Sequence, residues 1–403
     1  MPWKVEDLVS TRFEFVQRRR SGERMTDLCR EYGISRKTGH KIWARYERQG
    51  VQGLVDESRR PERLARRIPE SVRELILSFK KAHPTWGAKK LKVVLEERER
   101  GVRMPALSTI GELLKRHGLV KPRQRRRRST PTLGTLVPAL LPNAVWGSDF
   151  KGEFRLGNRE YCYPLTLSDL CSRFLLGCEA LEDQKGRGSR YACEEVFREY
   201  GLPDAIRTDN GPPFASTGLM GMTKLSVWWM RLGIKHERIE PGHPEQNGRH
   251  ERMHLTLKEE ATRPAGENIL AQQEKFDTFR EEFNNERPHE ALGMLRPAEV
   301  YTKSNRTYPE ELAELEYPLH DDVRQVKPCG HIALYGRNRS VYLTSALSGE
   351  RVGLRQLDQR QWLVTFMNLD LGLFNEEACR FVPLLHGWGE GEKLIGGEEG
   401  CTP

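Results

Sequence analysis

Apolar side chains change their spacing along the 403-residue chain, and each change predicts a different kind of element. In residues 72–79, 88–98 and 108–117 they recur every three or four positions, which predicts amphipathic helices. Beyond residue 143, alternating or short continuous apolar runs predict strands. The expected strands cover residues 145–156, 160–168, 173–180, 204–208 and 234–239, and the expected helices cover 189–200, 224–232 and 269–284. Three strands followed by alternating helices and strands predict a mixed α/β sheet.

The pattern changes again near residue 320. Short apolar runs separated by Gly, Asn and Asp predict strands at residues 323–326, 331–335, 340–343, 351–354 and 362–367. We expect these strands to form a small β-barrel over residues 320–384. The Gly- and Glu-rich residues 387–403 have a composition that predicts a disordered tail.

Two helix-turn-helix patterns precede the sheet, and the first lies in residues 1–60. An amphipathic helix ends at Gly33, which can adopt the positive φ of a tight turn, and Ser35 can cap the next helix. Ile42 and Trp43 are expected to face inward. Four side chains are left exposed on the leading turns of this second helix, where a recognition helix meets the major groove: Arg36, Lys37, His40 and Lys41.

The second pattern, in residues 65–120, has three expected helices with the break His83-Pro-Thr-Trp86-Gly87 after the first. We interpret Trp86 as a core anchor rather than a base-stacking residue. Lys89 and Lys90 follow this break and are candidate DNA contacts.

The basic charge is concentrated in the first third of the chain. Residues 1–128 hold 34 Lys and Arg against 16 Asp and Glu, a net charge of +18, whereas residues 129–403 hold 32 against 41, a net charge of −9. Such an asymmetry is typical of a segment that neutralises DNA phosphates. Residues 121–142 have no useful periodicity and predict a linker, whose run Arg125, Arg126, Arg127 and Arg128 is a candidate clamp on the DNA backbone.

The hydropathy of the chain and the spacing of its cysteines limit the classes of protein to which it can belong. No apolar run is long enough to span a membrane, and no apolar segment follows the amino terminus, so we expect a cytoplasmic, nucleoid-associated protein without a membrane partner. The eight cysteines include no C-x-x-C pair and are expected to be reduced.

Three carboxylates occur in contexts that suit metal binding. Asp149 begins an alternating run, Asp209 ends a short apolar stretch before Asn-Gly, and Glu251 lies early in an expected helix. Carboxylates at strand ends and on a nearby helix can hold two divalent cations, which activate an attacking oxygen and stabilise the leaving oxygen of a phosphodiester. Magnesium suits such an all-oxygen site, and Mn²⁺ is expected to substitute for it.

Two residues, Glu251 and Glu245, are candidates for the third metal-binding acid. Thirty-five residues separate Asp209 from Glu245, whereas Glu251 lies six residues further on. Glu245 falls before or at the first turn of the helix, while Glu251 lies one turn inside, with Leu255 and Lys258 on the same face. We expect Glu251 to be the metal ligand and the six additional residues to belong to the loop after Asp209.

The segment His250-Glu251-Arg-Met-His254 also satisfies the H-E-x-x-H pattern of zinc metalloproteases. A protease would need a third ligand downstream, and it would explain neither the other two acids nor the basic first third. We therefore set the zinc interpretation aside.

Trp146-Gly-Ser-Asp149, Thr208-Asp-Asn-Gly211 and Pro244-x-x-x-Gly248-x-x-Glu251 together resemble the catalytic core of DDE-type insertion-sequence transposases and retroviral integrases. The resemblance covers roughly residues 140 to 305. It implies a ribonuclease H-like integrase catalytic core over residues 143–305, with Asp149, Asp209 and Glu251 holding two Mg²⁺ ions. It further implies that Asn210 shapes the loop beside the metals and that Arg249 and Lys258 contact DNA phosphates.

The resemblance implies a DNA transposase that binds terminal inverted repeats and target DNA, cleaves strands and transfers them, acting as a homodimer or higher oligomer on DNA. Two alternatives remain at this point. A transposase-derived DNA-binding regulator would keep the recognition units without catalysis. A plain ribonuclease H would have no need of two recognition units.

Overall fold

The computed structural model describes residues 8–56, 68–120, 136–333 and 340–384. The chain divides into two compact units, Met1–Pro69 and Glu70–Pro403. The predicted clamp at Arg125, Arg126, Arg127 and Arg128 and the predicted tail at 387–403 lie outside the described residues.

In residues 8–56 the first unit has three α-helices, α1 (Leu8–Arg20), α2 (Met25–Glu31) and α3 (Arg36–Gln49), and a short 3-10 helix at Gly50–Leu54. Ser35 caps α3, because its hydroxyl accepts a hydrogen bond of 3.1 Å from the backbone N–H of Thr38. Helices α2 and α3 pack closely at Gly39, where an added Cβ would lie 2.4 Å from the sulfur of Cys29. The sequence pattern did not predict α1, because its apolar residues are spread around the helix: Phe15 and Val16 are buried whereas Val9 and Phe13 are exposed.

The second unit begins with α4 (Glu70–Ala82), α5 (Ala88–Arg98) and α6 (Leu107–Arg116), close to the three predicted helices. Trp86 is fully buried and stacks on His83 with ring centroids 4.2 Å apart, so its interpretation as a core anchor is confirmed.

A six-stranded mixed sheet follows, as predicted. Its strands are β1 (Val145–Phe150), β2 (Phe154–Arg155), β3 (Tyr161–Asp169), β4 (Leu175–Leu181), β5 (Ala205–Thr208) and β6 (Lys235–Arg238). The order is β2-β3-β1-β5-β6, and β4 also pairs with β3. Strands β1, β5 and β6 run parallel, whereas β2, β3 and β4 pair antiparallel. The single predicted strand over 145–156 divides into β1 and β2 because Gly152 turns the chain with a φ of +84°.

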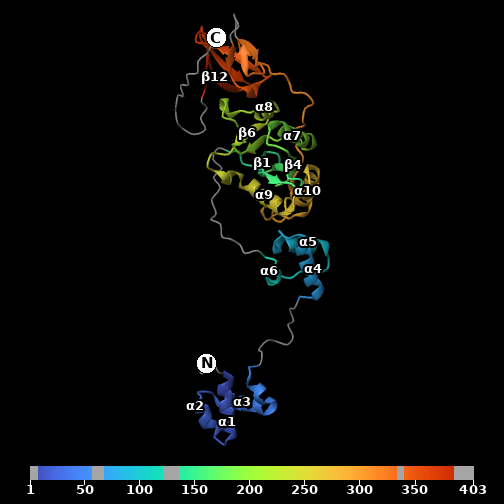
Figure 1. Ribbon diagram of the computed structural model, residues 1–403, viewed down its shortest axis with the longest axis vertical. Coiled ribbons are helices and arrows are strands. Elements are labelled where there is room, and N and C mark those ends of the chain that lie inside the picture. Colours follow the sequence, from blue (N-terminus) through green and yellow to red (C-terminus); the bar gives the residue numbers. More distant parts are fainter. Residues whose placement is uncertain (1–7, 57–67, 121–135, 334–339, 385–403) are drawn as a thin grey trace. The chain divides into compact units, whose positions relative to one another are not determined.

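Helices cover both faces of this sheet (Figure 1). On one face α7 (Gly186–Tyr200) and α8 (Lys224–Arg231) share a core with Trp146 and Ile206. On the other face α9 (Gly248–Glu260) and α10 (Ile269–Glu281) share a core with Leu175 and Cys178. A π-helical turn (Glu282–Glu286) continues α10. Because side chains alternate along β1, Trp146 faces α7 while Gly147 and Asp149 face α9.

The carboxyl-terminal strands differ from the prediction in closure and in number. β7 (Asp322–Gln325), β10 (Arg351–Gln356), β11 (Gln361–Phe366), β12 (Leu369–Asn375) and β13 (Arg380–Pro383) form one open sheet in the order β13-β12-β11-β10-β7. β8 (His331–Ala333) and β9 (Ser340–Tyr342) form a separate hairpin. Within the described residues the sheet does not close on itself, so the barrel is not confirmed, and β12 and β13 were not predicted.

In the described ranges no helix combines the length and apolar character required to cross a membrane. The seven cysteines within those ranges are all free thiols.

Candidate active site

The edge of the sheet where β1 and β5 end brings two of the predicted acids together. The parallel register pairs Gly147 with Arg207, and continuing it by two residues sets Asp149 beside Asp209. Asp209 is fixed by the turn that follows it, because the backbone N–H of Gly211 donates to its Oδ1 at 3.1 Å. The Asn210 amide donates to the carbonyl of Ile239 at 2.8 Å and so ties this turn to the segment after β6.

Helix α9 reaches the same edge because Gly147 leaves room for it. A Cβ at Gly147 would lie 2.8 Å from Nδ1 of His250. Asn247, directly before α9, donates a hydrogen bond of 3.0 Å to Oδ2 of Asp149. Glu251 lies in the first turn of α9, and its side chain is exposed.

The charges of the other two acids act on Asp149. Burial raises the pKa of Asp149 to about 7, and the charges of Asp209 and, less strongly, Glu251 contribute to this rise. The Asp149 side chain is 15% exposed. Burial and the neighbouring carboxylates both disfavour the charged form of Asp149, and a bound divalent cation would favour it.

The carboxylate of Glu245, the other candidate for the third acid, contacts a histidine. Glu245 lies in the short 3-10 helix Pro244–Asn247, and its Oε1 is 2.8 Å from Nδ1 of His243. The bond to His243 lowers the pKa of Glu245. Its carboxylate is therefore engaged by a neighbour two residues away in the chain.

The two histidines of the H-E-x-x-H segment face the interior. His250 and His254 are buried, and Nε2 of each lies 2.7 Å from the Thr166 hydroxyl. Burial lowers the pKa of both imidazoles, that of His250 to about 3. Across the described ranges, no three His, Cys, Asp or Glu side chains lie close enough together, as they stand, to hold a metal ion. These contacts oppose the zinc interpretation.

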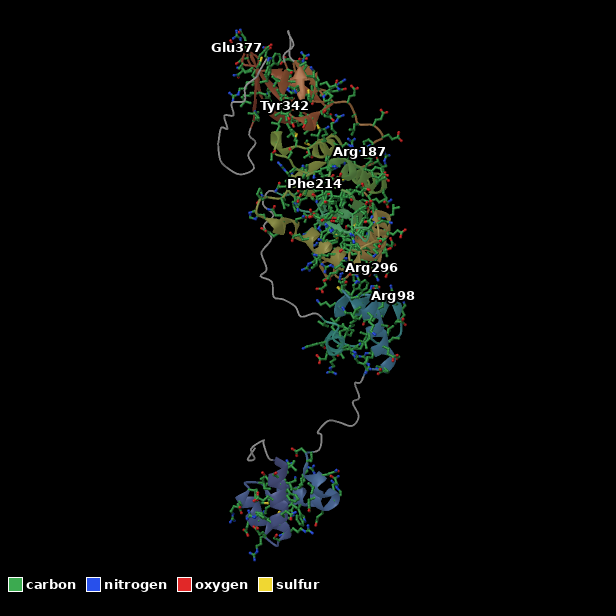
Figure 2. The ribbon with its side chains drawn as sticks, viewed as in Figure 1. Arg98, Arg187, Phe214, Arg296, Tyr342 and Glu377 are labelled. Atoms are coloured by element: carbon green, nitrogen blue, oxygen red, sulfur yellow. The ribbon has the colours of Figure 1, made fainter. Side chains whose placement is uncertain are left out.

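The loop after Asp209 is anchored by an aromatic residue. Phe214, labelled in Figure 2, is 1% exposed and stacks on Trp229 with ring centroids 6.1 Å apart. It also contacts Phe150 at the end of β1, with centroids 5.9 Å apart. This packing fixes the loop next to the strand that carries Asp149.

Comparison with known proteins identifies the domain built on this sheet. Two families described as integrase core domain match residues 139–244 and 232–297. The chain carries an integrase core domain. A family described as a helix-turn-helix domain matches residues 11–62, and one described as a homeodomain-like domain matches residues 38–114.

Relatives of the integrase core occur in insertion elements. An uncharacterized 39.2 kDa protein of insertion element IS476 from Xanthomonas euvesicatoria is 28% identical over 181 residues, which are 45% of this chain and 50% of that protein. An uncharacterized 31.7 kDa protein of insertion element IS407 from Burkholderia multivorans is 29% identical over 188 residues, or 46% and 65% of the two chains. The chain thus spans about half to two thirds of the length of these relatives.

A solved structure of the HTLV-2 integrase catalytic core domain in complex with magnesium aligns with 40% of this chain and 99% of its own, at 17% identity and a TM-score of 0.33. The integrase core is identified here by the family matches.

Basic side chains flank the acids of the integrase core. Lys258 is exposed on α9, seven residues after Glu251, and its charge helps to lower the pKa of Lys151 after the effect of burial. Lys151 and Asn247 were not predicted as site residues. The position of Lys151 two residues after Asp149, on the same side of an extended chain, was the available signal.

Arg249 lies on another flank of α9. One turn of helix separates Arg249 from Arg252 and Met253, and these three side chains line the same cavity. Nη1 of Arg249 donates to the carbonyl of Leu170 at 2.8 Å.

A further acid, Asp169 at the end of β3, has a structural role. It is buried and accepts hydrogen bonds from the backbone N–H groups of Asn143 and Ser172 and from the Ser172 hydroxyl. Among the described side chains Asp169 forms no ion pair with Arg173, four residues later in the chain.

The candidate DNA contacts of the two helical regions differ in their surroundings. All four on the leading turns of α3 are exposed: Arg36, Lys37, His40 and Lys41. On α5, Lys89 lies 3.4 Å from Glu290, and Lys90 lines a cavity with residues of the integrase core.

Proposed function

We propose that this chain is a DNA transposase that binds the terminal inverted repeats of an insertion element and catalyses strand cleavage and strand transfer. The observation that supports it most is that the ends of β1 and β5 set Asp149 beside Asp209, at an edge of the integrase core where the charge of Glu251 on α9 also acts on Asp149. The helix-turn-helix matches and the relatives in insertion elements support the DNA substrate.

Asp149, Asp209 and Glu251 would hold two Mg²⁺ ions, with Mn²⁺ as a substitute. The donors fit in kind, since they are carboxylates, and burial together with the charges of Asp209 and Glu251 raises the pKa of Asp149. Glu251 is exposed, so rotation of its side chain brings the third carboxylate toward the other two. When bound, these ions would activate an attacking oxygen and stabilise the leaving oxygen of a phosphodiester.

The surrounding residues prepare the site. Asn247 orients the Asp149 carboxylate, and the backbone N–H of Gly211 orients that of Asp209. Asn210 holds the turn in place. Lys258 and Lys151 supply positive charge where the DNA backbone must approach the acids. Pairing two DNA ends requires two protomers, so the proposal includes a dimer or larger assembly on DNA.

The test uses the full chain with duplex DNA that carries the ends of the element. We expect Mg²⁺-dependent strand cleavage at the end of the inverted repeat and none on a duplex of scrambled sequence. Binding without cleavage in either Mg²⁺ or Mn²⁺ would favour the alternative, a DNA-binding regulator derived from a transposase.

Recognition of the repeat is assigned to α3. Substituting Arg36 and Lys37 by Ala should weaken binding to the repeat more than binding to random DNA, by about 1–3 kcal/mol for each base that these side chains recognise. Arg20, exposed at the end of α1, is the control, and Arg20→Ala should not change the ratio of the two affinities. An equal weakening on both DNAs would mean that α3 contacts only the backbone.

A further inference from the structure

A basic cavity of about 280 Å³ lies beside α9, on the flank away from Glu251. It is lined by the end of β3, by α9, by the segment after α10 and by α5. Five of its lining side chains are basic: Lys90, Arg173, Arg249, Arg252 and Arg287.

Few acids offset these cations. Asp169 also lines the cavity, but its carboxylate is buried and occupied by hydrogen bonds from Asn143 and Ser172. Glu290 is exposed and lies 3.4 Å from Lys89 on α5. Only Arg287 of the five has an ion pair with a described residue, Glu260.

The side chains of Arg173, Arg252 and Lys90 form no hydrogen bond or ion pair with any residue that the structure describes. Burial and neighbouring positive charges lower the pKa values of Arg173 and Lys90. Burial, followed by the charges of Arg249 and Arg252, lowers the pKa of Arg173 to about 10. Burial, followed by the charge of Arg287, lowers the pKa of Lys90 to about 7. The cavity therefore has an uncompensated positive charge.

The backbone at Arg173 adds an independent observation. Its φ is +66°, a left-handed conformation that costs a residue with a side chain about 1 kcal/mol or more. Glycine would occupy this tight turn more easily. An arginine held there directs a guanidinium group into the cavity despite that cost.

We propose that this cavity binds a phosphate group of the DNA backbone, as a second contact between DNA and the integrase core. Arginines suit this ligand because their planar guanidinium groups donate paired hydrogen bonds to phosphate oxygens. The inference rests on the proposed function in one respect, namely that the anion comes from DNA. It adds a contact on the flank of α9 opposite the acids, which holds the duplex independently of the metal site.

The test compares the full chain with the double variant Arg173→Gln, Arg252→Gln. Affinity for a duplex is measured by fluorescence anisotropy at several salt concentrations. Because each phosphate neutralised by the protein contributes about 0.9 to the slope of log affinity against log salt, we expect the slope to fall by about one to two. Arg187→Gln, at an exposed arginine of α7 labelled in Figure 2, is the matched control and should leave the slope unchanged.

Folding is checked by melting temperature. Removing charge from a repelling cluster should leave the melting temperature of the double variant equal to that of the unsubstituted chain or higher. Arg252→Lys, which keeps the charge, should retain most of the slope. Equal slopes for the double variant and the unsubstituted chain would overturn the proposal, as would an equal fall in the Arg187→Gln control.

Inorganic phosphate separates the two sources of the anion. If phosphate raises the melting temperature of the unsubstituted chain but not of the double variant, while the salt slopes are equal, the cavity binds a free anion and the DNA assignment is wrong. If the proposed function is wrong, the unsubstituted chain shows no Mg²⁺-dependent cleavage. That result is separate from the salt slopes, because the proposed cleavage depends on Glu251 and not on this cavity.

Discussion

Helix α9 has opposite electrostatic environments on two of its flanks. Glu251 and the end of β1 make one flank acidic, with Asp149 at a pKa of about 7 because it is buried near other carboxylates. Arg249 and Arg252 make another flank basic, where Arg173 has a pKa of about 10 because it is buried near other cations. Each region holds like charges together, although Arg287 pairs with Glu260 on the basic flank and Asn247 donates to Asp149 on the acidic one.

Each flank is suited to a ligand of the opposite charge. Groups of like charge raise the free energy of the folded protein unless such a ligand neutralises them. A bound cation would stabilise the acidic flank, and a bound anion would stabilise the basic flank. In the two proposals above, the metal ion binds on one flank of α9 and the DNA phosphate on another.

The largest expected effect belongs to the acidic flank. Glu251→Gln should lower Mg²⁺-dependent strand cleavage by at least about 100-fold, or more than about 2.7 kcal/mol, because a metal ligand is removed. Glu245→Gln is the matched control and should stay near native activity, since that carboxylate contacts His243. The assignment is wrong if the two variants behave in the opposite way.

Asp149 offers a test through pH. Its folded pKa is raised from 3.8 to about 7, so it is uncharged in the folded state but charged in the unfolded state between these pH values. The folded protein therefore loses stability as the pH rises from about 4 to 7, and the loss is complete above pH 7. Asp149→Asn should raise the stability of the metal-free protein at pH 8 by on the order of 1–4 kcal/mol and have little effect at pH 4.

The control for this measurement is Asp370→Asn, at an exposed carboxylate on β12. It should leave the melting temperature unchanged at both pH values. Added Mg²⁺ should stabilise the unsubstituted chain at pH 8 but not the Asp149→Asn variant. A stabilising effect of Asp149→Asn that is equal at pH 4 and pH 8 would contradict the electrostatic explanation.

Substitution of Gly147 tests whether metal-dependent cleavage and duplex binding both depend on the packing of α9 against β1. Alanine there would place a Cβ 2.8 Å from His250 and 3.0 Å from Leu170. We expect Gly147→Ala to cost about 1–3 kcal/mol in the free energy of unfolding, measured with denaturant, and to weaken metal-dependent cleavage and duplex binding together. Gly87→Ala, where the added Cβ meets open space, is the control. A stable Gly147→Ala variant would mean that α9 can move away without cost.

The smallest expected effect concerns Lys258. Lys258→Gln should reduce cleavage at subsaturating DNA about fivefold, roughly 1 kcal/mol, because one exposed cation no longer attracts the phosphates. At saturating DNA the rate should change little. Lys224→Gln, at an exposed lysine at the start of α8, should have no effect on cleavage. A large fall at saturating DNA would instead place Lys258 beside the reacting groups.

The order of elements in the integrase core could be predicted from the sequence alone. Alternation and helical spacing are local properties, so β1, β3, β5, α8 and α9 lie close to where the pattern placed them. The predicted acids follow from short motifs that combine a strand end with a turn. The cap at Ser35 and the buried Trp86 also follow from short segments of sequence.

What each charged residue faces was decided by the tertiary structure. Arg249 and Lys258 lie on the same helix and look alike in sequence, yet Arg249 faces the basic cavity and Lys258 lies near Lys151 and the acids. From the sequence, Lys90 was a candidate DNA contact. In the structure its side chain lines a cavity together with residues of the integrase core. The open sheet of β7 and β10–β13 likewise depends on pairing between distant strands. Spacing fixes the face of a helix on which a residue lies, whereas the charge it meets there is contributed by segments remote in the chain.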